Sequence, residues 1–208
     1  FGLCVVKIGI SLTYSIVLGL VTVIGSILPI FINHISFAPQ ALTFLIIGLS
    51  IIISGVFLSG FAGILKDKIL NPKQTIALDG IIMAVISGVF SSLLNIGFIT
   101  GKNISLHAQA YGISEISSSS LIWLVVLFGG FITNSSYALY LLLKNKSLHV
   151  YKKLTIKIFL PILISAVFWY ATFALFGIGS TRLGNLGPSV GWATLIALSA
   201  IVSNVWGI

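Results

Sequence analysis

Long uncharged stretches separated by short polar segments are the dominant pattern in this chain. No Lys, Arg, Asp or Glu lies between Lys7 and Lys66. Residues 79–102, DGIIMAVISGVFSSLLNIGFITGK, place 22 uncharged residues between a carboxylate and an ammonium. At a rise of about 1.5 Å per residue, such a helix covers roughly 33 Å, close to the hydrocarbon thickness of a bilayer. We therefore expect 79–102 to cross a membrane as a helix, with its two charges at opposite surfaces.

The same reasoning divides the whole chain into about six transmembrane helices. The uncharged interval before Lys66 is long enough for two of them, and Asn33 and Pro39 in INHISFAPQ supply the turn. After Lys102, the segment NISLHAQAYGISE is expected to continue the helix until Gly112 breaks it. The expected spans are 6–31, 40–65, 79–102, 117–143, 158–179 and 188–208.

Composition agrees with this pattern. Hydrophobic residues make up 58% of the chain and charged residues 7%, and the mean hydropathy is +1.19. We therefore expect an all-α integral membrane protein, multi-pass in a cell membrane, which would be the cytoplasmic membrane if the source is a bacterium. The single cysteine, Cys4, excludes an internal disulfide. Because the only methionine is Met83 and both ends lie in apolar sequence, we expect an internal part of a longer protein.

The formal net charge of +8 predicts orientation rather than binding to nucleic acid, because the basic residues cluster between apolar runs. Connector 66–75 holds three lysines and connector 144–157 holds five. The connectors on the opposite side hold only Lys102 and Arg182. Since basic residues favour the cytoplasmic side, we expect connectors 66–75 and 144–157 to face the cytoplasm.

The chain lacks the residues that soluble enzymes use. It carries no nucleotide-binding glycine motif and no paired histidines of the kind that bind zinc. Of its three acidic residues, Asp67 lies in a connector, whereas Asp79 and Glu115 are expected on opposite sides of the membrane. We therefore expect a protein that is not an enzyme and has no cofactor or metal centre.

Polar residues inside the spans are the candidates for function, because they are costly in hydrocarbon. Helix 79–102 carries a stripe of small or weakly polar residues at helical spacing, which suits either close helix packing or the lining of a cavity. Its members are Ala84, Ser87, Gly88, Ser91, Ser92 and Asn95. Asn95 and Asn134 lie deep in spans, where an amide needs either a facing helix or a hydroxylated ligand as its partner.

Three further features near the membrane surfaces also have two interpretations. Lys102 either reaches the interface with its ammonium or takes part in transport. Arg182 in GSTRLGNLG is either a residue of an outer loop or part of a tight re-entrant turn permitted by Gly179 and Gly184. The aromatic residues of 168–176, including Trp169 and Tyr170, either pack in the protein and lipid or stack on a sugar ring.

Several phrases together resemble the L-rhamnose/proton symporter family of the drug/metabolite transporter superfamily. They are KIGISLTYSIVLGLVTVIGSILPIF, SGVFSSLLNIGFITGK, WYATFALFGIGSTRLGNLGPSVGWA and SNVWGI. The resemblance covers nearly the whole chain. Its most specific parts are G-V-F-S with the following lysine, and the W-Y…G-x-x-R-x-G…G-P-S-x-G-W pattern.

The resemblance implies a secondary transporter of ten helices in two inverted five-helix repeats. Such a protein would move a sugar or similar small metabolite by alternating access, with a proton as the possible coupling ion. Residues 1–65 would be the last two helices of the first repeat, 66–75 a cytoplasmic connector, and 76–208 the first four helices of the second repeat. It implies substrate contacts from Ser91, Asn95, Lys102, Trp169, Tyr170, Arg182, Ser189 and Trp192, together with Gly191. Hydroxyl and amide groups would bond substrate hydroxyls, an indole would stack, and Lys102 and Arg182 would shape an outer gate.

Two other classes remain open. A structural or receptor-type membrane protein would pair its polar residues between helices instead of around a pocket. A channel would need a continuous polar lining, which the sequence does not show. Because no acidic residue lies deep in a span, a coupling residue for protons is His107 or Lys102, lies outside this chain, or does not exist. Substrate identity and oligomeric state are not predicted.

Overall fold

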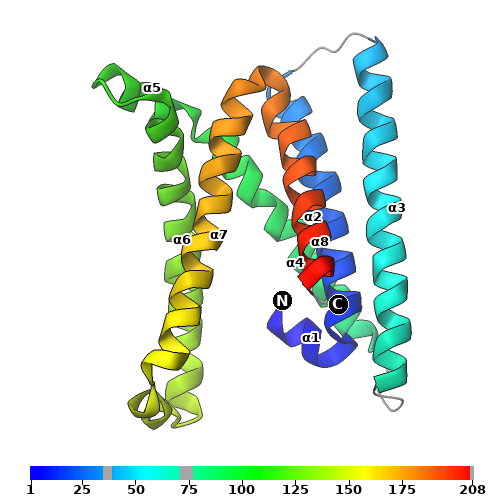
Figure 1. The fold of residues 1–208 in the computed structure, drawn as a ribbon, viewed down its shortest axis with the longest axis vertical. Helices are drawn as coiled ribbons and strands as arrows, with labels where there is room; N and C mark the ends of the chain where they lie inside the picture. Colours follow the sequence, from blue (N-terminus) through cyan, green and yellow to red (C-terminus); the bar gives the residue numbers. More distant parts are fainter. Residues whose placement is uncertain (35–38, 71–76, 207–208) are drawn as a thin grey trace. The chain divides into compact units, whose positions relative to one another are not determined.

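The computed structural model describes residues 1–34, 39–70 and 77–206. Within these ranges the chain is almost entirely helical and has no strand (Figure 1). Six helical stretches of the described residues are long and apolar enough to cross a bilayer. The expectation of an all-α protein with about six spans is therefore confirmed. The helices form two compact units, one of Phe1–Ile99 with Arg182–Ile208 and the other of Thr100–Thr181.

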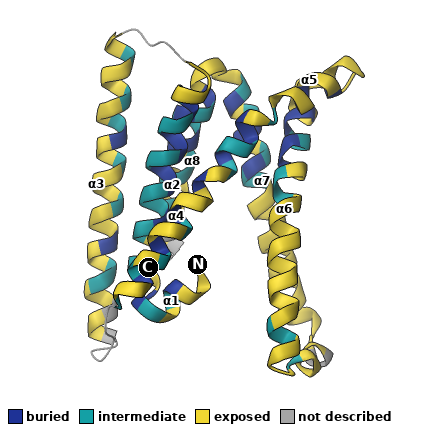
Figure 2. Cartoon of the chain, turned by 180° about the vertical axis from the view of Figure 1, so that it is seen from behind, coloured by how far each residue is buried: buried dark blue, intermediate teal, exposed yellow. Residues whose placement is uncertain are grey.

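In the first unit, α2 (Ile10–Ile32) is the central helix. It contacts α1 (Gly2–Ile8), α3 (Pro39–Leu70) and α8 (Trp192–Trp206), and α4 (Leu78–Thr100) packs against it through Gly88. The burial pattern follows this arrangement, because α2 and α4 carry buried positions whereas α3 is largely exposed (Figure 2). A bilayer would therefore contact much of α3.

Small residues let the helices of the first unit approach closely. A Cβ atom added at Gly60 or Gly63 of α3 would lie 2.1 or 2.3 Å from the side chain of Ser15 or Ser11 on α2. On α4, a Cβ added at Gly88 would lie 2.9 Å from Leu20. Because real contacts are essentially never so short, a side chain at any of these glycines would force the packing to shift. For Gly88 this favours the close-packing interpretation of the small-residue stripe.

The second unit contains α5 (Lys102–Ala110), α6 (Glu115–Lys144), the 3-10 helix η1 (Leu148–Lys153) and α7 (Ile156–Arg182) up to Thr181. Helices α5 and α6 are joined by hydroxyl and amide groups: Ser105 and Ser118 share a 2.8 Å hydrogen bond, and Gln109 donates to both hydroxyls. The Trp123 ring of α6 packs against Phe173 and Phe176 of α7. Small polar and aromatic contacts therefore hold this unit together.

The structure corrects four details of the sequence prediction. The first span begins at Ile10 instead of residue 6, because Gly9 at φ 83° separates α1 from α2. Helix α3 continues to Leu70, five residues beyond the expected end, and residues 71–76 of the predicted connector, with Lys73, lie outside the described residues. The last α-helix begins at Trp192 instead of Pro188, and α7 continues to Arg182, three residues beyond the expected end of that span at 179. The continuation of the third span to Ala110 and the break at Gly112 (φ 84°) are confirmed.

Candidate functional site: a junction on helix α2

The entry into α8 is not a regular helix. Gly184–Leu186 forms the 3-10 turn η2, and Gly187–Gly191 forms the π-helical turn η3 before α8 begins. Gly184 has φ 59°, which glycine adopts at little cost. Pro188 has no N–H to donate, so a regular helix is weakened at this point. Backbone carbonyls of such an irregular segment need partners from elsewhere, and side chains can supply them.

Asn95 of α4 supplies one of these partners. Its amide nitrogen donates to the carbonyl oxygen of Pro188 in η3 at 2.8 Å and to that of Gly25 in α2 at 2.7 Å. The side chain is completely buried. Asn95 therefore joins three separate segments of the chain through one amide group.

Ser189 and Trp192 make the same kind of contact from the other side. The Ser189 hydroxyl donates to the Ser26 carbonyl at 2.6 Å, and the Trp192 indole Nε1 donates to the Val21 carbonyl at 3.1 Å. Trp192 is 1% exposed, and its indole lies over Gly25, where a Cβ atom would be 2.3 Å from Nε1. We call this group the α2 junction; its members are Val21, Gly25, Ser26, Asn95, Pro188, Ser189 and Trp192.

Two polar atoms of the α2 junction have no hydrogen-bond partner among the described residues. They are Oγ of Ser26 and Oδ1 of Asn95, both fully buried. An unpaired polar atom in a dry interior costs free energy unless a ligand, water or a second conformation satisfies it. The junction holds no titratable side chain, so its chemistry is hydrogen bonding and not proton transfer.

The structure brings together only three of the residues that the sequence predicted for the site, Asn95, Ser189 and Trp192. Ser91 is exposed on α4, and its neighbour Ser92 is buried instead. Arg182 is exposed at the end of α7. The second unit contains Lys102, Trp169 and Tyr170, all of them exposed.

Sequence reasoning missed the contribution of α2. Neither Gly25 nor Ser26 was among the predicted site residues. An indole can lie on a helix backbone only where no Cβ intervenes, so a glycine opposite a buried tryptophan marks such a contact. The sequence does not show which glycine faces Trp192, because this depends on how the two helices are placed.

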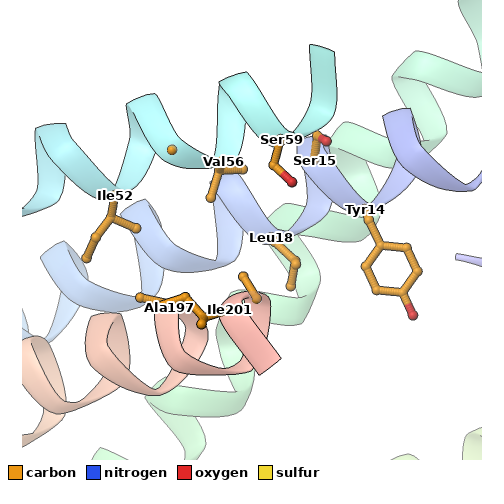
Figure 3. A pocket seen from close by; sticks show the side chains of 10 residues that line it. Tyr14, Ser15, Leu18, Ile52, Val56, Ser59, Ala197 and Ile201 are labelled. Atoms are coloured by element: carbon orange, nitrogen blue, oxygen red, sulfur yellow. The ribbon is translucent and has the colours of Figure 1, made fainter. Parts of the chain in front are cut away.

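A separate cavity of about 260 Å³ lies between α2, α3 and α8 (Figure 3). Leu18, Ile52, Val56, Ala197 and Ile201 give it a mainly apolar lining, to which Tyr14, Ser15 and Ser59 add hydroxyl groups. None of the predicted site residues lines this cavity. Its composition suits hydrocarbon better than a sugar.

An ion pair lies at the α1 end of the first unit. The Lys7 ammonium of α1 contacts the Asp79 carboxylate in the first turn of α4, and Gly80 packs against Ile8. The positive-inside pattern places both charged residues at the same membrane surface, and the ion pair fits that expectation. Among the described residues, no group of three His, Cys, Asp or Glu side chains could hold a metal ion.

Comparison with known proteins gives a consistent result. The sequence model of the family described as L-rhamnose-proton symport protein matches residues 1–208. Proteins named L-rhamnose-proton symporter from Pectobacterium atrosepticum and from strains of Yersinia pestis and Yersinia pseudotuberculosis are 23% identical over 219 residues. The match covers 100% of this chain and 64% of each relative, so the chain spans less than two thirds of their length. No solved structure matches the chain.

Proposed function

The chain belongs to the L-rhamnose-proton symport protein family along its whole length, and from this we propose that the complete protein is a secondary active transporter. It moves a rhamnose-like sugar or similar small metabolite across the membrane by alternating access, coupled to protons. The family match supports this proposal most strongly, and the six membrane-spanning helices agree with it. The relatives are named as symporters, which are not enzymes.

We further propose that the α2 junction is part of the substrate pathway. The support is the combination of an irregular helix entry and two buried, unpaired oxygen atoms on Ser26 and Asn95. Broken helices in transporters offer backbone and side-chain polar groups to a substrate near the middle of the membrane. When η3 separates from α2, the polar groups that now pair within the junction become available to substrate hydroxyls.

The other residues implied by the family resemblance are also proposed to contact substrate in the complete protein. Ser91 lies on α4 one turn before Asn95, and Arg182 lies just before the irregular entry into α8. Lys102, Trp169 and Tyr170, which would offer an ammonium and two aromatic rings, belong to the second unit. The inverted repeat, with its division at residues 66–75, remains a proposal about the complete protein.

Exchange of labelled L-rhamnose by the full-length protein in vesicles tests the site. Asn95→Ala and Ser189→Ala are each expected to reduce exchange about tenfold or more, because each removes a hydrogen-bond donor that is buried in the junction. Matched controls are Asn134→Ala and Ser199→Ala, whose side chains are exposed and bond carbonyls of their own helices. Equal effects of the junction and control variants on exchange, at equal amounts of folded protein, would contradict the proposed site.

A further inference from the structure

The segment between α6 and α7 is the most basic part of the chain. KNKSLHVYKKLTIK, residues 144–157, contains five lysines and no acidic residue. Lys144, Lys146 and Lys157 are exposed in the structure. More than half of the formal net charge of +8 therefore lies in one short connector that directly follows a membrane-spanning helix.

Lys146 adopts a backbone conformation that lysine does not favour. It has φ 51° at the end of α6, where its N–H donates to Leu143 O at 3.1 Å and the N–H of Ser147 donates to Leu142 O at 3.0 Å. This is the Schellman arrangement, in which glycine or asparagine normally occupies the left-handed position. Lysine therefore occupies this turn at a conformational cost that glycine or asparagine would not have.

Apolar and aromatic side chains alternate with these lysines. Leu148, Val150 and Tyr151 of η1 are about half exposed, at 47, 56 and 57%. In the last turns of α6, the rings of Tyr137 and Tyr140 stack at 6.4 Å, and the Lys144 ammonium lies 5.6 Å from the Tyr140 ring centre. Aromatic rings followed by lysines are typical of a helix end at the boundary between hydrocarbon and lipid headgroups.

We propose that residues 144–157 form a binding surface for the headgroups of anionic phospholipids. The lysines contact lipid phosphates, and Leu148, Val150 and Tyr151 enter the interfacial layer between them. Charge complementarity favours this occupant, because the cytoplasmic leaflet is negatively charged and the segment carries five positive charges with no compensating carboxylate. Because α6 ends at Lys144 and is long enough to cross a bilayer, Lys144 and Lys146 would lie near the depth of the phosphates.

The test uses the full-length protein in vesicles of phosphatidylcholine with and without phosphatidylglycerol. The measurement is the preference of the protein for spin-labelled phosphatidylglycerol over spin-labelled phosphatidylcholine. The variant with Lys146→Asn, Lys152→Gln and Lys153→Gln is expected to lose about fivefold or more of this preference at low salt, since each lysine near an anionic surface contributes attraction. The matched control removes the same number of charges from the other basic connector, through Lys66→Gln, Lys68→Gln and Lys73→Gln, and should keep most of the preference.

A further single variant separates charge from backbone strain. Asparagine suits the left-handed backbone better than lysine does, so Lys146→Asn should not destabilise the fold while it weakens the lipid preference.

Salt of ~1 M, at which the Debye length is about 3 Å, should reduce the preference of the unchanged protein to that of the triple variant. An unchanged lipid preference in the triple variant, or an equal loss in the control variant, would overturn the proposal.

Discussion

Replacing Gly25 by alanine would test the contact between α2 and α8. A Cβ atom at this position would lie 2.3 Å from Nε1 of Trp192 and 2.7 Å from its Cδ1. The indole is 1% exposed, so it cannot move aside into lipid without leaving its hydrogen bond to Val21. Overpacking of a well-packed interior costs about 1–3 kcal/mol, and loss of the indole hydrogen bond adds about 1 kcal/mol.

We therefore expect Gly25→Ala to lower the free energy of unfolding by about 2–4 kcal/mol. The assay is reversible unfolding of the full-length protein in mixed micelles of mild detergent and dodecyl sulfate, followed by circular dichroism. The same variant should reduce sugar uptake at equal amounts of inserted protein, because the junction cannot close as in the unmodified chain.

Gly19→Ala is the matched control on the same helix. A Cβ atom at Gly19 would lie 3.5 Å from Cγ1 of Val56, an ordinary contact distance, so no loss of stability is expected. A double-mutant cycle of Gly25→Ala with Trp192→Phe isolates the contact, because the smaller ring leaves room for the added methyl group. The double variant should be more stable than the sum of the single effects predicts, by about 1 kcal/mol or more. Equal stabilities of Gly25→Ala and Gly19→Ala, or strict additivity in the cycle, would refute the placement of Trp192 on Gly25.

Three other variants test separate parts of the structure. Asn95→Ala removes both amide hydrogen bonds of the α2 junction and should lower the free energy of unfolding by about 1–3 kcal/mol in mixed micelles. An unchanged free energy of unfolding would show that the amide does not join these helices. Gly88→Ala should be destabilising because its Cβ atom would lie 2.9 Å from both Cβ and Cδ1 of Leu20. A stable single variant would contradict this packing. Asp79→Asn removes the exposed ion pair with Lys7, so amide hydrogen exchange in α1 should become faster while the midpoint of global unfolding changes little. Unchanged hydrogen exchange in α1 would show that the ion pair does not hold this helix.

The sequence predicted the helices better than it predicted their contacts. Each span is visible as an uncharged run because hydrocarbon excludes charge, and this requirement acts on every helix separately. The continuation after Lys102 and the break at Gly112 were predictable for a similar reason, since both depend on local backbone preference. In contrast, the π-helical turn before Trp192 is bonded to α4 and α2 through Asn95 and Ser189, and such contacts cannot be read from one span.

The candidate site shows the same limit. Asn95 was identifiable from the residues themselves because an amide in a span needs a partner, whereas Ser189 and Trp192 were named only through the family resemblance. Which backbone they would bond could not be predicted, because the carbonyls of Val21 and Gly25 look like those of any other helix residue. Ser91 and Ser92 illustrate the point, since adjacent helical residues face directions about 100° apart and only the packing partner decides which one is buried.

Uptake of labelled L-rhamnose by the full-length protein in vesicles, with and without an imposed proton gradient, tests the central claim most directly. We expect accumulation of the sugar above its external concentration when the proton gradient points inward, and only equilibration after a proton ionophore is added. Failure of folded, inserted protein to accumulate L-rhamnose or any of a panel of related sugars under the gradient would contradict the proposed proton-coupled sugar transport.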